Sequence, residues 1–323
     1  MNDAGWATRS FRRVEHKIAR PLRVLTYHRI AESSSEPRGL RVSPGNFDAH
    51  LASLATAGVV PLDRTLSLEA GKRPRGYVHR FAITFDDGYA DNLEVALPLL
   101  ERHDVPATVF VATFYIDRPY FWWDRLFDIV VGGNLDTTRV VDAAYQVGLL
   151  VEQSAETLAP ASSASVHDTL FQALIDRHAA DKVGLLDELG RALSFIAPID
   201  AARPLTTEKL QELAAHPLIT IGAHTHTHPQ LTAVSPEEAS RDVAVGARLL
   251  DELLGPTKRL FAYPHGKANK VVARLVKSAG HDFAFTTVSR PISMTDSSLL
   301  LPRISVTDID GGEFARRRGL NGE

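Results

Sequence analysis

The chain has 323 residues, of which 44 % are hydrophobic and 23 % charged, so it is not disordered, collagen-like or coiled-coil along its whole length. Its 36 Lys and Arg residues nearly balance its 39 Asp and Glu residues, and the net charge of −3 predicts no nucleic-acid partner. The chain has no cysteine, which excludes disulfides, a thiolate nucleophile and cysteine-bound zinc. Any metal site must therefore use His, Asp or Glu.

The first 22 residues lack an apolar stretch of signal-peptide length, and no apolar run reaches transmembrane length. The sequence therefore predicts a cytoplasmic protein. Residues 1–22 are instead predicted to form a basic amphipathic leader, because a helix would place apolar residues 11, 14, 18 and 22 on one face. We favour a leader helix packed under the domain, with peripheral contact of residues 6–23 with an anionic membrane as the alternative.

Strands and helices are predicted to alternate in the first third of the chain. In chain order they are a strand over 23–28, a polar loop over 30–46, a helix over 47–57, a strand over 80–85, a helix from its N-cap Asp91 to about 103, and a strand over 106–113.

A helical insertion of about residues 115–205 interrupts this alternation, and its Pro/Ala/Ser-rich residues 159–165 read as a flexible connection. The aromatic run Tyr120-Phe121-Trp122-Trp123 opens the insertion. We expect these rings to pin the insertion to the domain; the alternative is that they wall a sugar-binding cleft.

The alternation then resumes and ends in a polar, basic tail over 311–323, expected to lack regular structure. The elements are a helix over 206–215, a strand over 218–223, a helix over 236–254 capped by Ser235, a strand over 259–263, a helix over 269–279, and strands over 283–288 and 301–306. This order predicts an α/β fold, a distorted (β/α) barrel of parallel strands with outer helices. Catalytic groups of such barrels lie at the carboxyl ends of the strands.

Two adjacent carboxylates, Asp86 and Asp87, follow the second strand in the segment Thr84-Phe-Asp-Asp-Gly88. Where the strand curls into a turn, they can face one site in different roles, one binding a metal and the other free as a base. A bare Asp-Asp-Gly is also common in turns that cap a helix.

Three histidines at alternate positions, His224, His226 and His228, follow the strand over 218–223. Neutral imidazole is a common zinc ligand. His224 and His228 are four residues apart and can converge on one ion across a turn, whereas an extended segment would bring all three together.

A tight turn follows the next strand in Phe261-Ala-Tyr-Pro-His-Gly266. Its backbone amides could stabilise an oxyanion, although alone it is typical of a plain strand-to-helix turn.

In this order the motifs resemble the polysaccharide deacetylases, the NodB-like carbohydrate esterases. The resemblance runs from about residue 23 to 306 and leaves out the insertion. Residues 84–88 match the first family motif and residues 224–228 the second. Three further segments are similar to a subgroup linked to exopolysaccharide synthesis: residues 27–29, 91–92 and 301–304.

The resemblance implies a barrel of the NodB-homology type over residues 23–310 and a metal-dependent hydrolase that removes N-acetyl groups from a GlcNAc-type sugar. Asp87, His224 and His228 would hold the metal, with Zn²⁺ as the default and Co²⁺ or Ni²⁺ as alternatives. Asp86 would be the base that deprotonates a metal-bound water. The backbone amide of His265 would help to hold the oxyanion.

The sequence departs from the family pattern in the third motif and in the general acid. Ala262 stands where an arginine usually pairs with the catalytic Asp, and we expect Arg303 to reach across in its place. The late Leu-x-His motif that supplies the acid is not visible. His28 is the first candidate for the acid and His265 the second; His28 could equally be a core histidine bonded to backbone.

Three other functions stay open. A deformylase or O-acetyl esterase on a related glycan would use the same residues, and a non-catalytic, metal-stabilised carbohydrate-binding protein would keep them without turnover. A glycosidase is disfavoured because adjacent carboxylates cannot flank a glycosidic bond. The expected partner is an N-acetylated polysaccharide, oligosaccharide or lipid-linked glycan.

Overall fold

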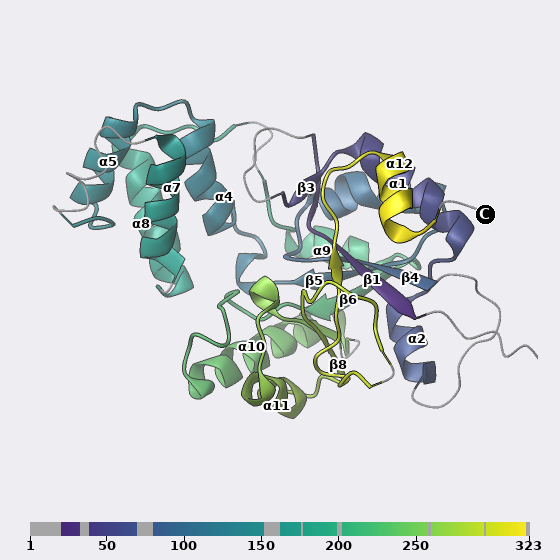
Figure 1. Ribbon diagram of the computed structural model, residues 1–323. Coiled ribbons are helices and arrows are strands. Elements are labelled where there is room, and N and C mark those ends of the chain that lie inside the picture. The colour runs from purple at the N-terminus through teal and green to yellow at the C-terminus, as the bar shows by residue number, and fades with distance from the viewer. Residues whose placement is uncertain are drawn as a thin grey trace, which may run out of the picture.

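The computed structural model describes residues 21–32, 39–69, 80–151, 162–175, 177–198, 202–257, 260–293 and 295–320. A curled parallel sheet lies at its centre (Figure 1). The strands of this sheet, in spatial order, are β8 (Phe283–Phe285), β7 (Leu260–Ala262), β6 (Ile219–Ala223), β5 (Ala107–Val111), β4 (Arg80–Phe85), β1 (Leu22–Tyr27) and β9 (Ile304–Ser305).

The two edges of the sheet are joined by the segment that leads into β9. Leu301 forms a parallel bridge with Phe285 of β8, and three residues after the bridge the chain enters β9, which pairs with β1. The Val306 amide donates to the Thr26 carbonyl and extends that pairing. The sheet therefore curls into a distorted parallel barrel, as predicted, and the ends of all its strands meet at one rim.

Side chains alternate between the barrel interior and the surrounding helices, as the period of a strand requires. Val24, Ala82 and Phe110 pack inside, whereas Leu25 and Ile83 pack against the helices. The helices of the barrel are α1 (Pro44–Ala57), α2 (Leu62–Glu69), α3 (Leu97–Arg102), α9 (Thr207–Ala215), α10 (Pro236–Leu254), α11 (Lys270–Ser278) and α12 (Gly311–Arg318). The prediction of alternating strands and outer helices is confirmed.

The insertion forms a separate helical layer at one side of the sheet (Figure 1). Its helices are α4 (Trp122–Phe127), α5 (Thr137–Gln146), α7 (Ser163–Ile175) and α8 (Ala179–Ala192). They share their own apolar core, which contains Leu126, Val140, Leu170 and Leu186. The helical character predicted for this stretch is confirmed.

Three local predictions were wrong. The stretch predicted as a loop over 30–46 contains the short strand β3 (Arg41–Val42), which pairs in parallel with β2 (Arg29–Ile30). Residues 311–318 of the expected tail form α12, because Asp310 caps the helix and Phe314 is fully buried. Asp91 does not cap its helix, which opens with a π-helical turn over Asn92–Ala96; its carboxylate binds Arg29 instead.

Residues 1–20, most of the predicted leader, and residues 159–161 of the predicted connection lie outside the described residues. Among the helices that the structure describes, none combines the length and apolarity needed to span a bilayer.

Candidate active site

Asp86 and Asp87 come directly after β4 and turn into the same rim of the barrel. Asp87 has a φ of 74°, a left-handed conformation that non-glycine residues rarely adopt, and Gly88 follows with a φ of 87°. This sharp turn lets two adjacent carboxylates leave the strand toward one place. Both residues are buried, with 3 % of Asp86 and 4 % of Asp87 exposed. Buried carboxylates must be compensated by partners, and each has its own set.

The histidine segment follows β6 and is held in a tight loop. Thr225 and His228 both have left-handed backbones, with φ of 69° and 59°. The Thr225 hydroxyl accepts a hydrogen bond from the His228 amide at 3.0 Å. Asp242 of α10 accepts from two further loop amides, and Gly246 of α10 lies so close that a Cβ there would come within 2.7 Å of the Thr225 backbone. Strain of this kind persists only where the surroundings enforce it, as they do here.

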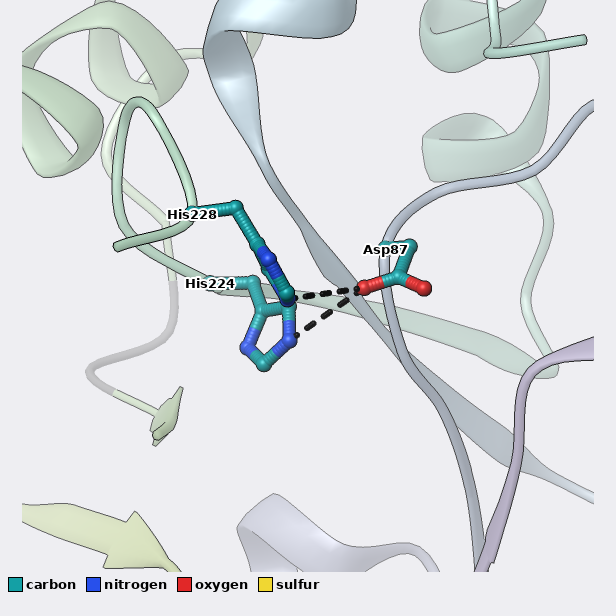
Figure 2. A group of neighbouring side chains, drawn as sticks. All are labelled: Asp87, His224 and His228. Atoms are coloured by element: carbon teal, nitrogen blue, oxygen red, sulfur yellow. Dashed lines mark ion pairs between the residues drawn. The ribbon is translucent and has the colours of Figure 1, made fainter. Parts of the chain in front are cut away.

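Asp87, His224 and His228 converge on a common point, as Figure 2 shows. Asp87 Oδ1 lies 3.4 Å from His224 Nε2 and 3.3 Å from His228 Nε2. Two ligands about 2.1 Å from an ion, at tetrahedral angles, are separated by roughly 3.4 Å. Among the described residues this is the one cluster of three potential metal-binding groups. The spacing and the two-imidazole, one-carboxylate donor set therefore fit a divalent metal.

The protonation of these groups also suits a metal. His224 Nδ1 donates to the Ala262 carbonyl at 2.8 Å, and in the neutral imidazole this leaves the Nε2 lone pair facing Asp87. Burial alone would raise the pKa of Asp87, but the neighbouring imidazoles of His224 and His228 lower it well below its ordinary value. A carboxylate that stays ionised beside an imidazole lone pair is the state that coordination requires.

His226 lies outside the cluster, so the alternative of a three-histidine site is wrong. Its ring Nδ1 is 2.9 Å from the Thr113 hydroxyl, and the ring packs edge-on against Phe114. The turn at Thr225 breaks the extended geometry that would have put all three rings on one face.

Asp86 is paired with Arg303, which lies just before β9. The Arg303 guanidinium donates to both Asp86 oxygens at 2.7 Å, and it also donates to the Thr84 hydroxyl and the Thr286 carbonyl at 3.2 Å. Arg303 is fully buried, and its guanidinium lies over the Phe110 ring in the barrel interior. Burial would raise the pKa of Asp86, but Arg303 lowers it. Asp86 is therefore held ionised and in one orientation.

His28 follows β1 at the same rim and is half-buried. Its charge acts on both Asp86 and Asp87, whose pKa values it helps to lower after the larger effects of burial and their direct partners. Asn92 donates to the His28 carbonyl at 2.9 Å, and this bond fixes the backbone. Within the part of the chain that the structure describes, the His28 imidazole has no hydrogen-bond partner, unlike the backbone-bonded core histidine of the alternative interpretation.

His265 sits in the turn after β7, in a left-handed conformation with a φ of 57° between Pro264 and Gly266. Its ring packs against that of His228, with centroids 4.9 Å apart, so the residue reaches the edge of the metal cluster. Desolvation and the neighbouring His228 lower the pKa of His265, and Lys182 adds to the shift. A lowered pKa disfavours the protonated imidazole that a general acid needs.

The insertion touches the metal cluster through the aromatic side chain of Trp123. Trp123 packs on His228 with ring centroids 4.7 Å apart. Its indole N–H donates to the Tyr89 hydroxyl, which in turn donates to Asp124, both at 2.8 Å. Burial raises the pKa of Asp124 to about 7. Phe121, Trp122 and Trp123 are all buried, so these rings pin the insertion to the barrel and do not offer open faces for stacking sugars.

Several residues of the site carried no recognisable signal in the sequence. Asp242 and Gly246 lie in an ordinary amphipathic helix, and only the fold shows that they shape the histidine loop. Tyr89 was visible only as the residue after Asp-Asp-Gly, with nothing to connect it to Trp123.

The model of the polysaccharide deacetylase family matches residues 76–153 and 163–284, more than half of the chain. The chain therefore belongs to the polysaccharide deacetylases. The match runs through much of the insertion, which the sequence motifs alone had left outside the resemblance.

Comparison with curated and solved proteins points the same way. The chain is 22 % identical over 289 residues to "Putative polysaccharide deacetylase YxkH" of Bacillus subtilis (strain 168), covering 88 % of this chain and 71 % of that protein. The deacetylase PplD of Streptococcus pyogenes, solved with acetate, has a TM-score of 0.58 at 19 % identity, over 92 % of this chain and 97 % of that one. IcaB of Ammonifex degensii has a TM-score of 0.58 at 18 % identity, over 93 % and 96 %. At these identities the two solved structures establish the shared fold.

Proposed function

We propose that this protein is a metal-dependent hydrolase that removes N-acetyl groups from a GlcNAc-type sugar of a glycan. The observation that carries the proposal is that Asp86 and Asp87 are neighbours with different partners. Asp87 belongs to the metal cluster, whereas Asp86 lies beside it and is bound through both oxygens by Arg303. Family membership supports the same activity.

Asp87, His224 and His228 would hold the metal. When bound, a divalent cation supplies Lewis acidity to the acyl carbonyl and to water. We propose Zn²⁺, because two imidazoles and one carboxylate are a common zinc donor set; Co²⁺ and Ni²⁺ would be accepted by the same ligands.

The remaining residues would transfer protons to and from the reacting groups and hold the oxyanion. Asp86 would take a proton from the attacking water, since Arg303 keeps it ionised at neutral pH. The turn at His265 would present backbone amides to the oxyanion. His28 is the acid that we favour for protonating the departing amine, because its imidazole has no hydrogen-bond partner among the described residues and its charge acts on both carboxylates.

The proposal is tested by measuring acetate and formate release from N-acetylated and N-formylated oligosaccharides, with chelated protein and with protein reloaded with Zn²⁺. We expect acetate release that depends on metal and is lost in Asp86→Asn, which keeps metal and glycan binding. Formate release alone would favour a deformylase, and acetate from O-acetylated sugars alone would favour an esterase. Tight glycan binding without release of either acid, in metal-loaded protein, would favour the non-catalytic alternative.

The subgroup resemblance suggests an exopolysaccharide as the glycan. Residues of two of the subgroup segments sit at the site: His28 beside both carboxylates and Arg303 on Asp86. For residues 1–22 we propose a leader helix packed under the domain, with peripheral membrane contact of residues 6–23 as the alternative, and sedimentation with anionic vesicles distinguishes the two.

A further inference from the structure

The chain enters and leaves the insertion beside the two loops that carry the metal cluster. Just before the insertion, the Phe114 amide donates to the His226 carbonyl in the histidine loop, residues 224–228, at 2.9 Å. At the end of the insertion, the Leu205 amide donates to the Gly88 carbonyl in the turn after β4 at 3.0 Å. Both ends of the insertion are therefore anchored at the same rim of the barrel as the metal cluster.

Trp123 of the insertion lies between these two loops. Its indole ring packs on His228 with centroids 4.7 Å apart, and its N–H donates to the Tyr89 hydroxyl at 2.8 Å. His228 belongs to the histidine loop, whereas Tyr89 lies two residues after Asp87 in the turn that follows β4. Figure 1 shows α4, which carries Trp123, on the side of the insertion that faces the sheet. One buried side chain of the insertion thus joins both loops.

The Tyr89 hydroxyl is held by a directional chain of hydrogen bonds. It accepts from Trp123, so its own proton is available to a second partner, and Asp124 accepts that proton at 2.8 Å. The Tyr89 ring is fully buried, with its centroid 4.4 Å from that of Phe121 and 5.3 Å from the Arg29 guanidinium. If Tyr89 turned away, the Trp123 N–H and the Asp124 carboxyl would lose a buried partner, which is costly.

The two histidines of the metal cluster are oriented in different ways. His224 has the arrangement common to metal-binding histidines, in which the second ring nitrogen donates to a backbone carbonyl. The His228 imidazole makes no such hydrogen bond to the described residues, apart from its contact with Asp87. Its ring is held by packing, with Trp123 at 4.7 Å and the rings of His224 and His265 at 4.9 Å. The orientation of His228 therefore depends on its ring neighbours.

Resting on the proposed metal-dependent function, we propose that Trp123 and Tyr89 are positioning residues of the metal cluster, so that the insertion is part of the metal-binding unit. Trp123 holds the His228 ring where its Nε2 faces Asp87, and Tyr89 holds Trp123. Neither residue binds the metal, and both act through His228. Residues that orient a metal ligand typically change metal affinity by about 10- to 100-fold when they are replaced.

The test measures Zn²⁺ dissociation constants of the full-length protein by calorimetry. Trp123→Leu removes both the ring contact and the N–H, and it should weaken Zn²⁺ binding by about tenfold or more. Tyr89→Phe keeps the ring and removes only the hydroxyl, so it should weaken binding by a smaller factor. The visible spectrum of bound Co²⁺ depends on ligand geometry and should change in both variants, which a loss of stability alone would not cause.

A double variant tests whether the two residues act as one unit. Trp123→Phe and Tyr89→Phe remove opposite ends of the same hydrogen bond. Their combined loss of Zn²⁺ affinity should therefore be smaller than the sum of the two single losses. Fully additive losses would contradict the coupling of Trp123 to Tyr89.

Trp122→Leu is the matched control, since Trp122 is also buried but stacks on Phe171 inside the insertion, with centroids 4.9 Å apart. It should lower stability in urea unfolding and leave Zn²⁺ affinity and the Co²⁺ spectrum unchanged. Equal losses of affinity in Trp122→Leu and Trp123→Leu overturn the proposal, as do native affinity and spectrum in Tyr89→Phe and Trp123→Phe. The latter two decide the matter if Trp123→Leu does not fold. A native protein that binds no Zn²⁺ counts against the proposed function instead.

Discussion

Replacing Arg303 with methionine tests what the Asp86–Arg303 pair contributes to stability and activity. Methionine has a similar length and no charge, so Arg303→Met removes the four hydrogen bonds of the guanidinium without opening a large cavity. Asp86 then remains buried with its principal cationic partner gone. Removing one member of a buried pair costs about 3–5 kcal/mol, because the other charge is left uncompensated.

The same substitution should shift the acid limb of the pH–activity profile to higher pH. Arg303 now lowers the pKa of Asp86 against the opposing effect of burial, so in Arg303→Met burial prevails and the pKa rises. In the native protein, the stabilising contribution of Asp86 is present above the ordinary pKa of an aspartate, near 3.9, and is lost as pH falls through its lowered value. In the variant the sign of this contribution reverses, because the ionised and unpaired Asp86 destabilises the folded state. This destabilisation is relieved as pH falls and Asp86 becomes protonated.

Urea unfolding at several pH values and kcat/KM against pH measure both effects. The acid limb of kcat/KM should shift to higher pH in Arg303→Met. The double variant Asp86→Asn/Arg303→Met should be more stable than the sum of the single changes, because it buries no unpaired charge. Full turnover with an unmoved acid limb would refute the assignment of Arg303 as the partner that holds Asp86 ionised.

Two further substitutions test the general acid and the loop that carries the histidines. His28→Ala should remove the basic limb of the pH–rate profile while metal affinity stays unchanged, and an unaltered basic limb would exclude His28 as the acid. Gly246→Ala should destabilise the protein by about 1–3 kcal/mol, because the new Cβ would come within 2.7 Å of the Thr225 backbone, and it should weaken Zn²⁺ binding measured by calorimetry. The control Gly184→Ala, in the middle of α8 with open space around it, should instead be neutral or stabilising by up to about 1 kcal/mol. Equal stability and metal affinity in both glycine variants would contradict the role of this close approach.

The elements with strong local signals were predictable. The strand predicted over 80–85 and the helix predicted over 236–254 have those same bounds in the structure. The strand is a short, mostly apolar run that ends at the Asp-Asp-Gly turn, and the helix has a complete capping box. The short pairing of Arg29–Ile30 with Arg41–Val42 carried no such signal. The C-terminal helix α12 looked like a polar tail because only one of its residues, the apolar Phe314, is buried.

The site was predictable where its chemistry is local in sequence. The pairs Asp86–Asp87 and His224–His228 could be read as clusters from their spacing. The exclusion of His226 could not, because it depends on the left-handed turn at Thr225. The contact of Trp123 with His228 joins residues more than a hundred positions apart, so only the packing of the insertion reveals it.

Arg303 pairs with Asp86 in place of the arginine that the family pattern has at the position of Ala262, and the way the barrel closes explains why. Ala262 ends β7 with its side chain in the barrel interior, and Arg303 enters the same interior from the segment that joins β8 to β1. Strand β1 alone separates β9 from β4, which carries Asp86, so an arginine there lies nearer along the sheet than one on β7. A small residue at 262 leaves room for the guanidinium over Phe110. We therefore expect Ala262→Arg to crowd Arg303 and not to reinforce it, because the interior can satisfy only one buried guanidinium at Asp86.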